Sequence, residues 1–319
     1  MDVRNISQND FTYNILVDAY CKEGMVKDAE DVIELMIQKG VDPDVVTYSS
    51  LMDGYCLRGE VDKALAVFES MARKGILPNA LSYNILINGY CRKMKVDRAI
   101  ALFQQMPSKG LAPTIETYST ILQGFFYAGR HVEARKFFKE KMINEGVELD
   151  IVTCNILLHG LCQNCYVFEA LSFFQILESR GLVPDIHVYT ILMDGLSKNG
   201  HLENARSLFD NLPAKGLRPN VKTYTVMIQA YCNEGLLDEA NELFREMEAD
   251  DCLPNDVTYN MLIRGCLQNK NYYEAGVLLD EMFGRGFAAD ASTASGLLDL
   301  LDVQEQNPAL LALCKKYSP

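Results

Sequence analysis

Residues 10–44, DFTYNILVDAYCKEGMVKDAEDVIELMIQKGVDPD, contain the pattern that decides the fold. In their first part, bulky side chains recur at three- and four-residue spacings, as on one face of an amphipathic helix: Tyr13, Leu16, Val17, Tyr20 and Cys21. Gly24 ends this helix, and the spacing of Ala29, Ile33 and Met36 predicts a second helix over about residues 26–38. The stretch therefore predicts a helix-turn-helix hairpin.

The hairpin is repeated along the chain eight times. Its tyrosine recurs 35 residues apart, with Cys154 in place of one tyrosine and a single spacing of 36 before it: Tyr13, Tyr48, Tyr83, Tyr118, Cys154, Tyr189, Tyr224 and Tyr259. An alanine of the second helix confirms the register without exception: Ala29, Ala64, Ala99, Ala134, Ala170, Ala205, Ala240 and Ala275. The predicted repeats are 10–44, 45–79, 80–114, 115–150, 151–185, 186–220, 221–255 and 256–290.

A small residue lies midway along each first helix: Ala19, Gly54, Gly89, Gly124, Gly160, Gly195, Ala230 and Gly265. Glycine lowers helix propensity, so these positions indicate that a neighbouring helix packs closely against them. One hairpin cannot bury both of its apolar sides. We therefore expect an all-α fold, a right-handed α-solenoid superhelix lined on its inner surface by the first helices.

The two ends of the chain lie outside the eight repeats. Residues 1–9 are a lead-in, and residues 291–319 are predicted to form a degenerate ninth first helix over 291–301 and a capping helix over 309–316. The first ten residues have neither the apolar core of a signal peptide nor the basic character of a transit peptide. No targeting signal is therefore predicted there.

Composition narrows the class of protein. Of 319 residues, 49% are hydrophobic, which is enough for a core along the whole length. The net charge is -13, the wrong sign for a protein held to nucleic acid by its overall field. No apolar run is long enough to span a membrane, so we expect no membrane partner. The ten cysteines without a signal peptide are expected to be free thiols.

The repeat resembles that of the pentatricopeptide repeat family. The resemblance covers residues 10–290 and rests on stretches such as Val45-Val46-Thr47-Tyr48-Ser49, Asn88-Gly89-Tyr90-Cys91-Arg92 and Met71-Ala72-Arg73-Lys74-Gly75. These stretches are most similar to plant members of the plain, unextended class, including fertility-restorer-like proteins. The related tetratricopeptide repeat has 34 residues and a tryptophan, whereas this chain contains no tryptophan.

The resemblance implies that two side chains per repeat recognise one RNA base: the residue after the tyrosine, and the last residue of the repeat. These base-reading pairs are Asn14 with Asp44, Ser49 with Asn79, Asn84 with Thr114, Ser119 with Asp150, Asn155 with Asp185, Thr190 with Asn220, Thr225 with Asn255, and Asn260 with Asp290. All are short polar residues, which can offer distinct donors and acceptors to a base edge. The family's usual correspondence implies the RNA sequence 5'-UA(C/U)GUAAU-3'.

Helix capping is an alternative explanation for one member of each pair, the repeat-ending residue. An Asp or Asn that follows a proline and precedes a helix is a typical helix cap. Capping does not explain the polar residue after each tyrosine, because Asn, Ser and Thr are unfavourable inside a helix. We therefore favour RNA contact, which requires both members of each pair to line one open surface.

Two further sets of residues are implied by the resemblance. Apolar side chains two positions before the tyrosine would sandwich the base: Phe11, Val46, Leu81, Val152 and Val257. The equivalent residues Glu116, His187 and Lys222 depart from this apolar pattern. Basic residues at the far end of the first helix would contact phosphates: Lys22, Arg92 and Lys198. With so few cations, binding should depend only weakly on salt.

Catalysis has one apparent signal. His131 and Glu133, followed by Cys162 and Cys165, are spaced similarly to the ligands of zinc deaminases. Leu161 stands where that signature has a proline, and no strand is predicted, so we expect neither a metal site nor an enzyme. The recurring cysteines are expected to pack as small apolar side chains. No cofactor and no small-molecule substrate are predicted.

The sequence thus leaves two functions open. The favoured one is selective binding of single-stranded RNA in organellar RNA processing, stabilisation or translation, with processing or translation factors as possible partners. The resemblance implies the mitochondrion, with the chloroplast as the other candidate. The alternative is a protein-binding helical scaffold whose acidic surface engages a basic partner.

Overall fold

The structure is a computed structural model that describes residues 9–179 and 181–302. Regular structure in those residues is entirely helical. The first helices of the eight hairpins are α1 (Asp10–Lys22), α3 (Val45–Leu57), α5 (Ala80–Arg92), α7 (Ile115–Tyr127), α9 (Ile151–Gln163), α11 (Ile186–Lys198), α13 (Val221–Asn233) and α15 (Asp256–Gln268). The all-α solenoid class is therefore confirmed.

The second helices vary more in length. They are α2 (Val26–Gln38), α4 (Val61–Arg73), α6 (Val96–Gln105), α8 (His131–Phe137), α10 (Val167–Ser179), α12 (Leu202–Asp210), α14 (Leu237–Ala249) and α16 (Tyr272–Gly284). Helices α6 and α12 end before Pro107 and Pro213, which have no backbone N–H to continue the helical hydrogen bonds. Each is followed by a short 3-10 turn, η1 (Pro107–Lys109) and η3 (Pro213–Lys215).

The spacing of 36 residues has a local cause in the fourth hairpin. After α8 the backbone continues as a π-helical turn, η2 (Phe138–Ile143). A π-turn accommodates one additional residue without breaking the helix. Phe138 and Met142 remain buried, so the insertion is absorbed without loss of the core contacts on either side.

The last helix that the structure describes is a further first helix, α17 (Ala291–Asp302). The sequence predicted this helix over 291–301, one residue shorter. The helix predicted over 309–316 and residues 1–8 of the lead-in lie outside the described residues.

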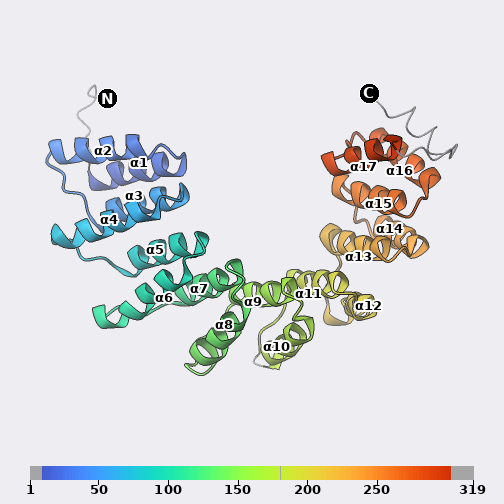
Figure 1. Ribbon diagram of the computed structural model, residues 1–319, viewed down its shortest axis with the longest axis horizontal. Coiled ribbons are helices and arrows are strands. Elements are labelled where there is room, and N and C mark those ends of the chain that lie inside the picture. Colours follow the sequence, from blue (N-terminus) through green and yellow to red (C-terminus); the bar gives the residue numbers. More distant parts are fainter. Residues whose placement is uncertain (1–8, 180, 303–319) are drawn as a thin grey trace. The chain divides into compact units, whose positions relative to one another are not determined.

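Two compact units make up the chain, Met1–Gly160 and Leu161–Pro319. In the first unit, α1 contacts α3, α3 contacts α5, and α5 contacts α7 (Figure 1). In the second, α11 contacts α13, α13 contacts α15, and α15 contacts α17. The second helices α2, α4, α6, α12 and α14 each pack on the first helix of their own hairpin and on that of the next. Within each unit the first helices therefore form one continuous layer.

Glycines allow these first helices to approach closely. A Cβ atom on Gly54, Gly89 or Gly124 would lie 2.4–2.6 Å from the thiol sulfur of the preceding hairpin's Cys21, Cys56 or Cys91. Gly195 and Gly265 face Cys162 and Cys232 in the same way, and Gly160 faces the ring of Phe126. The predicted close packing at these glycines is confirmed. Burial raises the pKa of the Cys91 thiol to about 12, as expected for a cysteine that packs as an apolar residue.

Aromatic rings join consecutive hairpins on the other side of the first helix. A phenylalanine of one second helix meets the repeat tyrosine of the next first helix edge to face, with ring centroids 5.0–5.4 Å apart: Phe68–Tyr83, Phe103–Tyr118, Phe174–Tyr189, Phe209–Tyr224 and Phe244–Tyr259. Such pairs contribute about 0.5–1.5 kcal/mol beyond the burial of their area. The tyrosine is thus fixed in the core, and the residue after it is held in a defined direction.

We predict that Gly89→Ala lowers the free energy of unfolding by about 1–3 kcal/mol, because its methyl group would overlap the Cys56 sulfur. Cys56→Ala removes that sulfur and leaves the nearest atom 3.1 Å away, so the double variant should regain much of the loss. Gly284→Ala in α16 is the control, since its added methyl group would have no atom within 4 Å and alanine favours the helix. Denaturant unfolding of the four proteins measures the effects. Equal losses in Gly89→Ala and the double variant would contradict this packing.

Candidate nucleic-acid interface

The repeat-ending residues cap the first helices that follow them. Asp44 accepts hydrogen bonds from the backbone N–H groups of Val46 and Thr47, at 3.0 and 2.9 Å. Asn79 caps α5 and Asn255 caps α15 through single bonds of the same kind. The capping explanation of these residues is therefore confirmed. All eight repeat-ending residues nevertheless remain half-buried or exposed, so their outer edges are accessible.

The residues after the tyrosines are mostly less accessible than direct contact of both pair members with RNA requires. Six have only 2–8% of their surface exposed: Ser49, Asn84, Ser119, Thr190, Thr225 and Asn260. Asn14 and Asn155 are half-buried. The expected open row of both members of each pair is therefore wrong for these six, because the next first helix lies against them. Only the repeat-ending members form an accessible set.

Five of these six buried side chains contact a hydroxyl of the next hairpin. Thr117 donates to Asn84 Oδ1 at 2.7 Å, and the hydroxyls of Ser49 and Ser82 lie 3.0 Å apart. The same contact joins Ser119 to Thr153, Thr190 to Thr223, and Thr225 to Thr258, at 2.7–3.1 Å. In each case the hydroxyl belongs to the residue immediately before the next tyrosine or its equivalent. No buried hydroxyl in these contacts is left without a partner.

That hydroxyl also contacts the repeat-ending residue. Ser82 Oγ lies 3.2 Å from Asn79 Oδ1, Thr153 Oγ1 lies 2.6 Å from Asp150 Oδ1, and Thr258 Oγ1 lies 3.0 Å from Asn255 Oδ1. The two members of a base-reading pair are thus bridged by a hydroxyl from the following hairpin. We call these three side chains a polar triad. Each triad couples a buried side chain to an accessible one.

The bridging Ser or Thr was missed in the sequence analysis, although its signal was present. It recurs at the repeat interval as Thr47, Ser82, Thr117, Thr153, Thr223, Thr258 and Thr293. Val188 stands at this position in the sixth repeat and has no hydroxyl to donate. Asn155 Oδ1, of the preceding pair, is buried with no hydrogen-bond partner. The fifth pair therefore lacks the bridging group that the other pairs have.

Hydrogen bonds set the charge state of the first triad. Burial alone would raise the pKa of the Asp44 carboxyl, but bonds from the Thr47 backbone and hydroxyl, from Asn14 and from the Val46 backbone outweigh it. The pKa of Asp44 is therefore held below its ordinary value. At neutral pH this residue is an ionised acceptor.

Exposed apolar side chains lie beside the caps. The five predicted base-sandwiching residues occupy the second position of their helices and are 47–69% exposed: Phe11, Val46, Leu81, Val152 and Val257. Each is therefore available for contact with an apolar surface such as the face of a base. Glu116, at the equivalent place in α7, instead accepts a hydrogen bond from Asn84 Nδ2 at 3.4 Å. The position beside the third pair is accordingly polar rather than apolar.

The predicted phosphate contacts are partly neutralised in the free protein. Lys22 and Lys198 each bond a carboxylate one turn earlier, Asp18 and Asp194, at 2.7 Å. These exposed pairs are weak, so a phosphate can compete for the ammonium groups. Arg92 is exposed near Asp53, whose pKa is raised by burial and by the charge of Asp18. Two of the three predicted phosphate-contacting side chains are therefore already paired with a carboxylate.

The two cysteines of the apparent zinc signature differ in their surroundings. Cys162 is buried against Gly195, whereas Cys165 is exposed with a positive φ of 65°. Among the described residues, no three His, Cys, Asp or Glu side chains are grouped as metal ligands. In the same part of the chain, no helix has the length and apolar character needed to cross a bilayer.

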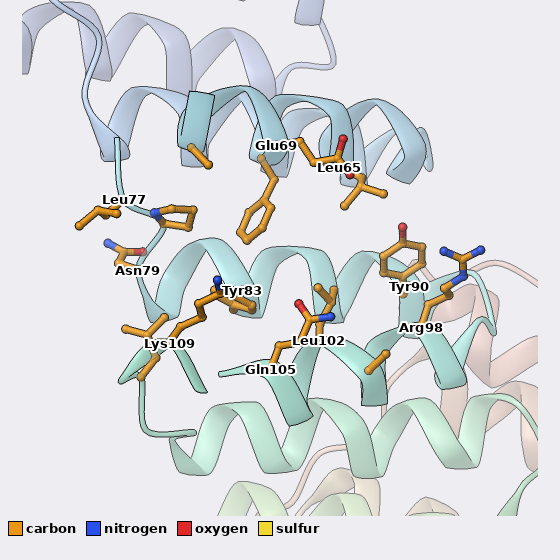
Figure 2. Close-up of a pocket in the computed structure, with 15 residues that line it drawn as sticks. Leu65, Glu69, Leu77, Asn79, Tyr83, Tyr90, Arg98, Leu102, Gln105 and Lys109 are labelled. Carbon is orange, nitrogen blue, oxygen red and sulfur yellow. The ribbon is translucent and has the colours of Figure 1, made fainter. Parts of the chain in front are cut away.

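The first unit contains a cavity of about 780 Å³ between α4, α5 and α6. Figure 2 shows Leu65 and Glu69 of α4 facing Tyr90 of α5 and Arg98 of α6 across it. Its remaining lining is largely apolar, and Asn79 is the one base-reading residue that reaches its edge. The cavity thus lies between consecutive second helices, and none of the residues of the apparent zinc signature lines it.

A family model for the PPR repeat family matches the chain at residues 8–57, 43–92, 78–127, 117–163, 149–198, 184–233, 223–268 and 254–301. The chain belongs to the PPR repeat family. The repeats inferred from the recurring tyrosine and alanine are therefore PPR repeats. No curated protein matches the chain as a whole.

Solved structures of the same family resemble the PPR chain. Maize PPR10 is 19% identical, with a TM-score of 0.44, over 99% of this chain and 59% of that one. PPR10 in complex with an 18-nt psaJ RNA element is 22% identical, with a TM-score of 0.46, over 92% and 52%. Yeast Rmd9p in complex with a 16-nt target RNA is 13% identical, with a TM-score of 0.47, over 99% and 69%. The chain spans about half the length of the PPR10 chain solved with RNA.

We predict that Thr117→Val lowers the free energy of unfolding by about 1–3 kcal/mol, because it leaves Asn84 Oδ1 buried without its donor. Thr120→Val is the matched control, since Thr120 is more exposed and bonds only the Glu116 carbonyl of its own helix. That control should change stability by less than about 0.5 kcal/mol. Urea unfolding compares them, and equal effects would argue against the triad as a stabilising contact.

Proposed function

We propose that this PPR protein binds single-stranded RNA selectively, with one base at each repeat. One observation carries the proposal: at the start of the first helices, an accessible polar cap lies beside an exposed apolar side chain. The pattern returns at the repeat interval, as in Asp44 with Val46 and Asn79 with Leu81. A base needs both kinds of contact, an apolar one for its face and a polar one for its edge.

The buried member of each pair acts, in this proposal, through its triad. Asn84 Oδ1 accepts the Thr117 proton, so this hydroxyl can only accept from the repeat-ending side. In the second triad either Ser49 or Ser82 can be the donor, so the Ser82 proton can go to Ser49 or to Asn79. The residue after the tyrosine therefore sets the donors and acceptors that the accessible cap offers to a base.

The order of pairs gives the proposed target. By the family's usual correspondence, the repeats prefer 5'-UA(C/U)GUAAU-3', with the amino end of the chain at the 5' end. We further propose that the protein is of the plain class and similar to fertility restorers. It would act in a mitochondrion, or else a chloroplast, by occupying a transcript and so protecting it or exposing a neighbouring site to processing or translation factors.

We predict that Asn79→Asp moves the preference at the second base from A to G. Asp caps helices as well as Asn does, so the fold should be retained. In gel-shift titrations the wild type should bind the octamer with A at position two about tenfold more tightly than the one with G. The variant should show the reverse order.

A scrambled octamer is the control for both proteins. Selective binding of the matched octamer with no change in preference would contradict the role of the repeat-ending residue. Equal and weak binding of matched and scrambled RNAs by the wild type would contradict RNA recognition altogether.

We predict a shallow dependence of RNA affinity on salt. Two to four phosphate contacts on a single strand give a log-log slope of about -1.5 to -3. The basis is that Lys22 and Lys198 already have carboxylate partners and that the net charge is -13. Titrations between about 50 and 200 mM salt measure the slope. A value steeper than about -6 would show that phosphate contacts dominate.

A protein-binding scaffold is the second candidate, and a specific surface favours it. Helix α14 presents an exposed acidic series, Asp238, Glu239, Glu242 and Glu246. Such a surface suits a basic partner. It lies on a second helix, whereas the caps lie at the start of the first helices, so the two functions would use different surfaces.

A further inference from the structure

The first and eighth repeats have the same base-reading pair in different surroundings. Asn14 with Asp44 and Asn260 with Asp290 are both Asn followed by Asp, and the two-residue correspondence gives them the same base. One turn after the Asn, however, the first repeat has Asp18 and the eighth has Arg264. The equivalent residues of the other repeats carry no permanent positive charge: Asp53, Asn88, Gln123, His159, Asp194 and Gln229.

In the first repeat the triad is complete and its carboxylate is held by neutral groups. The Thr47 hydroxyl lies 2.5 Å from Asn14 Oδ1 and 2.9 Å from Asp44 Oδ1, and it can donate its one proton to either oxygen. Asn14 Nδ2 donates to the same Asp44 oxygen at 3.3 Å. The backbone N–H groups of Val46 and Thr47 complete the set. Asp44 thus remains charged, and its Oδ2 atom takes part in none of these bonds.

In the eighth repeat a guanidinium group holds the carboxylate instead. Arg264 Nη1 lies 3.0 Å from Oδ1 and 2.8 Å from Oδ2 of Asp290. The Thr293 backbone N–H also donates to Oδ1, at 2.8 Å. The pKa of Asp290 lies below its ordinary value: burial would raise it, but these hydrogen bonds outweigh that. Both oxygens of this carboxylate therefore have a partner within the protein.

The amide of the eighth pair is also engaged differently. Asn260 Oδ1 accepts from the Asp290 backbone N–H at 2.9 Å, and its Nδ2 donates to the carbonyls of Asp256 and Ala288 at 2.8 and 3.3 Å. Thr293, which occupies the place of Thr47, has a buried hydroxyl oxygen with no hydrogen-bond partner. The bridging contact of the triad is therefore missing, although all three residue types are present.

We propose that Arg264 closes the eighth base-reading pair, so that the protein accepts any base at the eighth position. This inference rests on the proposed RNA recognition and adds a residue that determines its specificity. A base edge that approached Asp290 would have to displace the guanidinium from both carboxylate oxygens. Asn260, whose amide is 2% exposed, offers no alternative group.

The test compares the first and eighth positions of the octamer in equilibrium binding by the full chain. U1 and U8 are replaced in turn by C, A and G. With wild-type protein, replacing U1 should weaken binding about tenfold, and replacing U8 less than about threefold. Arg264→Gln introduces the residue of the seventh repeat, Gln229, and should raise the effect of replacing U8 toward that of U1.

The reciprocal change transfers the property to the first repeat. Asp18→Arg should reduce the effect of replacing U1 to less than about threefold, while Asp18→Gln, which also removes the partner of Lys22, should preserve it. Equal discrimination at U1 and U8 by the wild type would overturn the role of Arg264 while leaving RNA recognition intact. No difference between matched and scrambled octamers would overturn both.

Discussion

The close approach of consecutive first helices is the constraint on which the rest of the structure depends. It is possible because a glycine of one helix faces a cysteine of the preceding one, as Gly124 faces Cys91. At this separation a side chain after one tyrosine reaches the hydroxyl before the next tyrosine. The same packing that forms the core thus also forms the polar triads, so that stability and the proposed recognition depend on the same contacts.

This arrangement gives capping residues a second possible role. Each repeat-ending Asp or Asn lies at a helix N-terminus, where its side-chain oxygen accepts a hydrogen bond from a backbone N–H group. Its remaining edge points outward beside an exposed apolar side chain such as Val46 or Leu81. An acidic protein can therefore offer a regular set of polar contacts to RNA without the basic surface that nonspecific nucleic-acid binders need.

Much of the fold could be predicted from the sequence because its causes lie within one repeat. The spacing of Tyr13 and Ala29, and the glycines such as Gly54, give the hairpin and its stacking directly. The burial of Ser49 could not be predicted in this way, because it depends on how far Ser82 of the next helix reaches. The contact between Arg264 and Asp290 likewise joins residues whose relative position depends on an intervening helix. Periodicity gives the face of a helix, but not the depth to which its neighbour covers that face.

The most direct measurement is a crystal structure of the full chain with the octamer UACGUAAU. We expect the bases to enter between exposed apolar side chains, with their Watson–Crick edges within hydrogen-bonding distance of Asp44, Asn79 and the other accessible caps. RNA bound along the second helices, or held by its phosphates with the bases turned to solvent, would contradict the account.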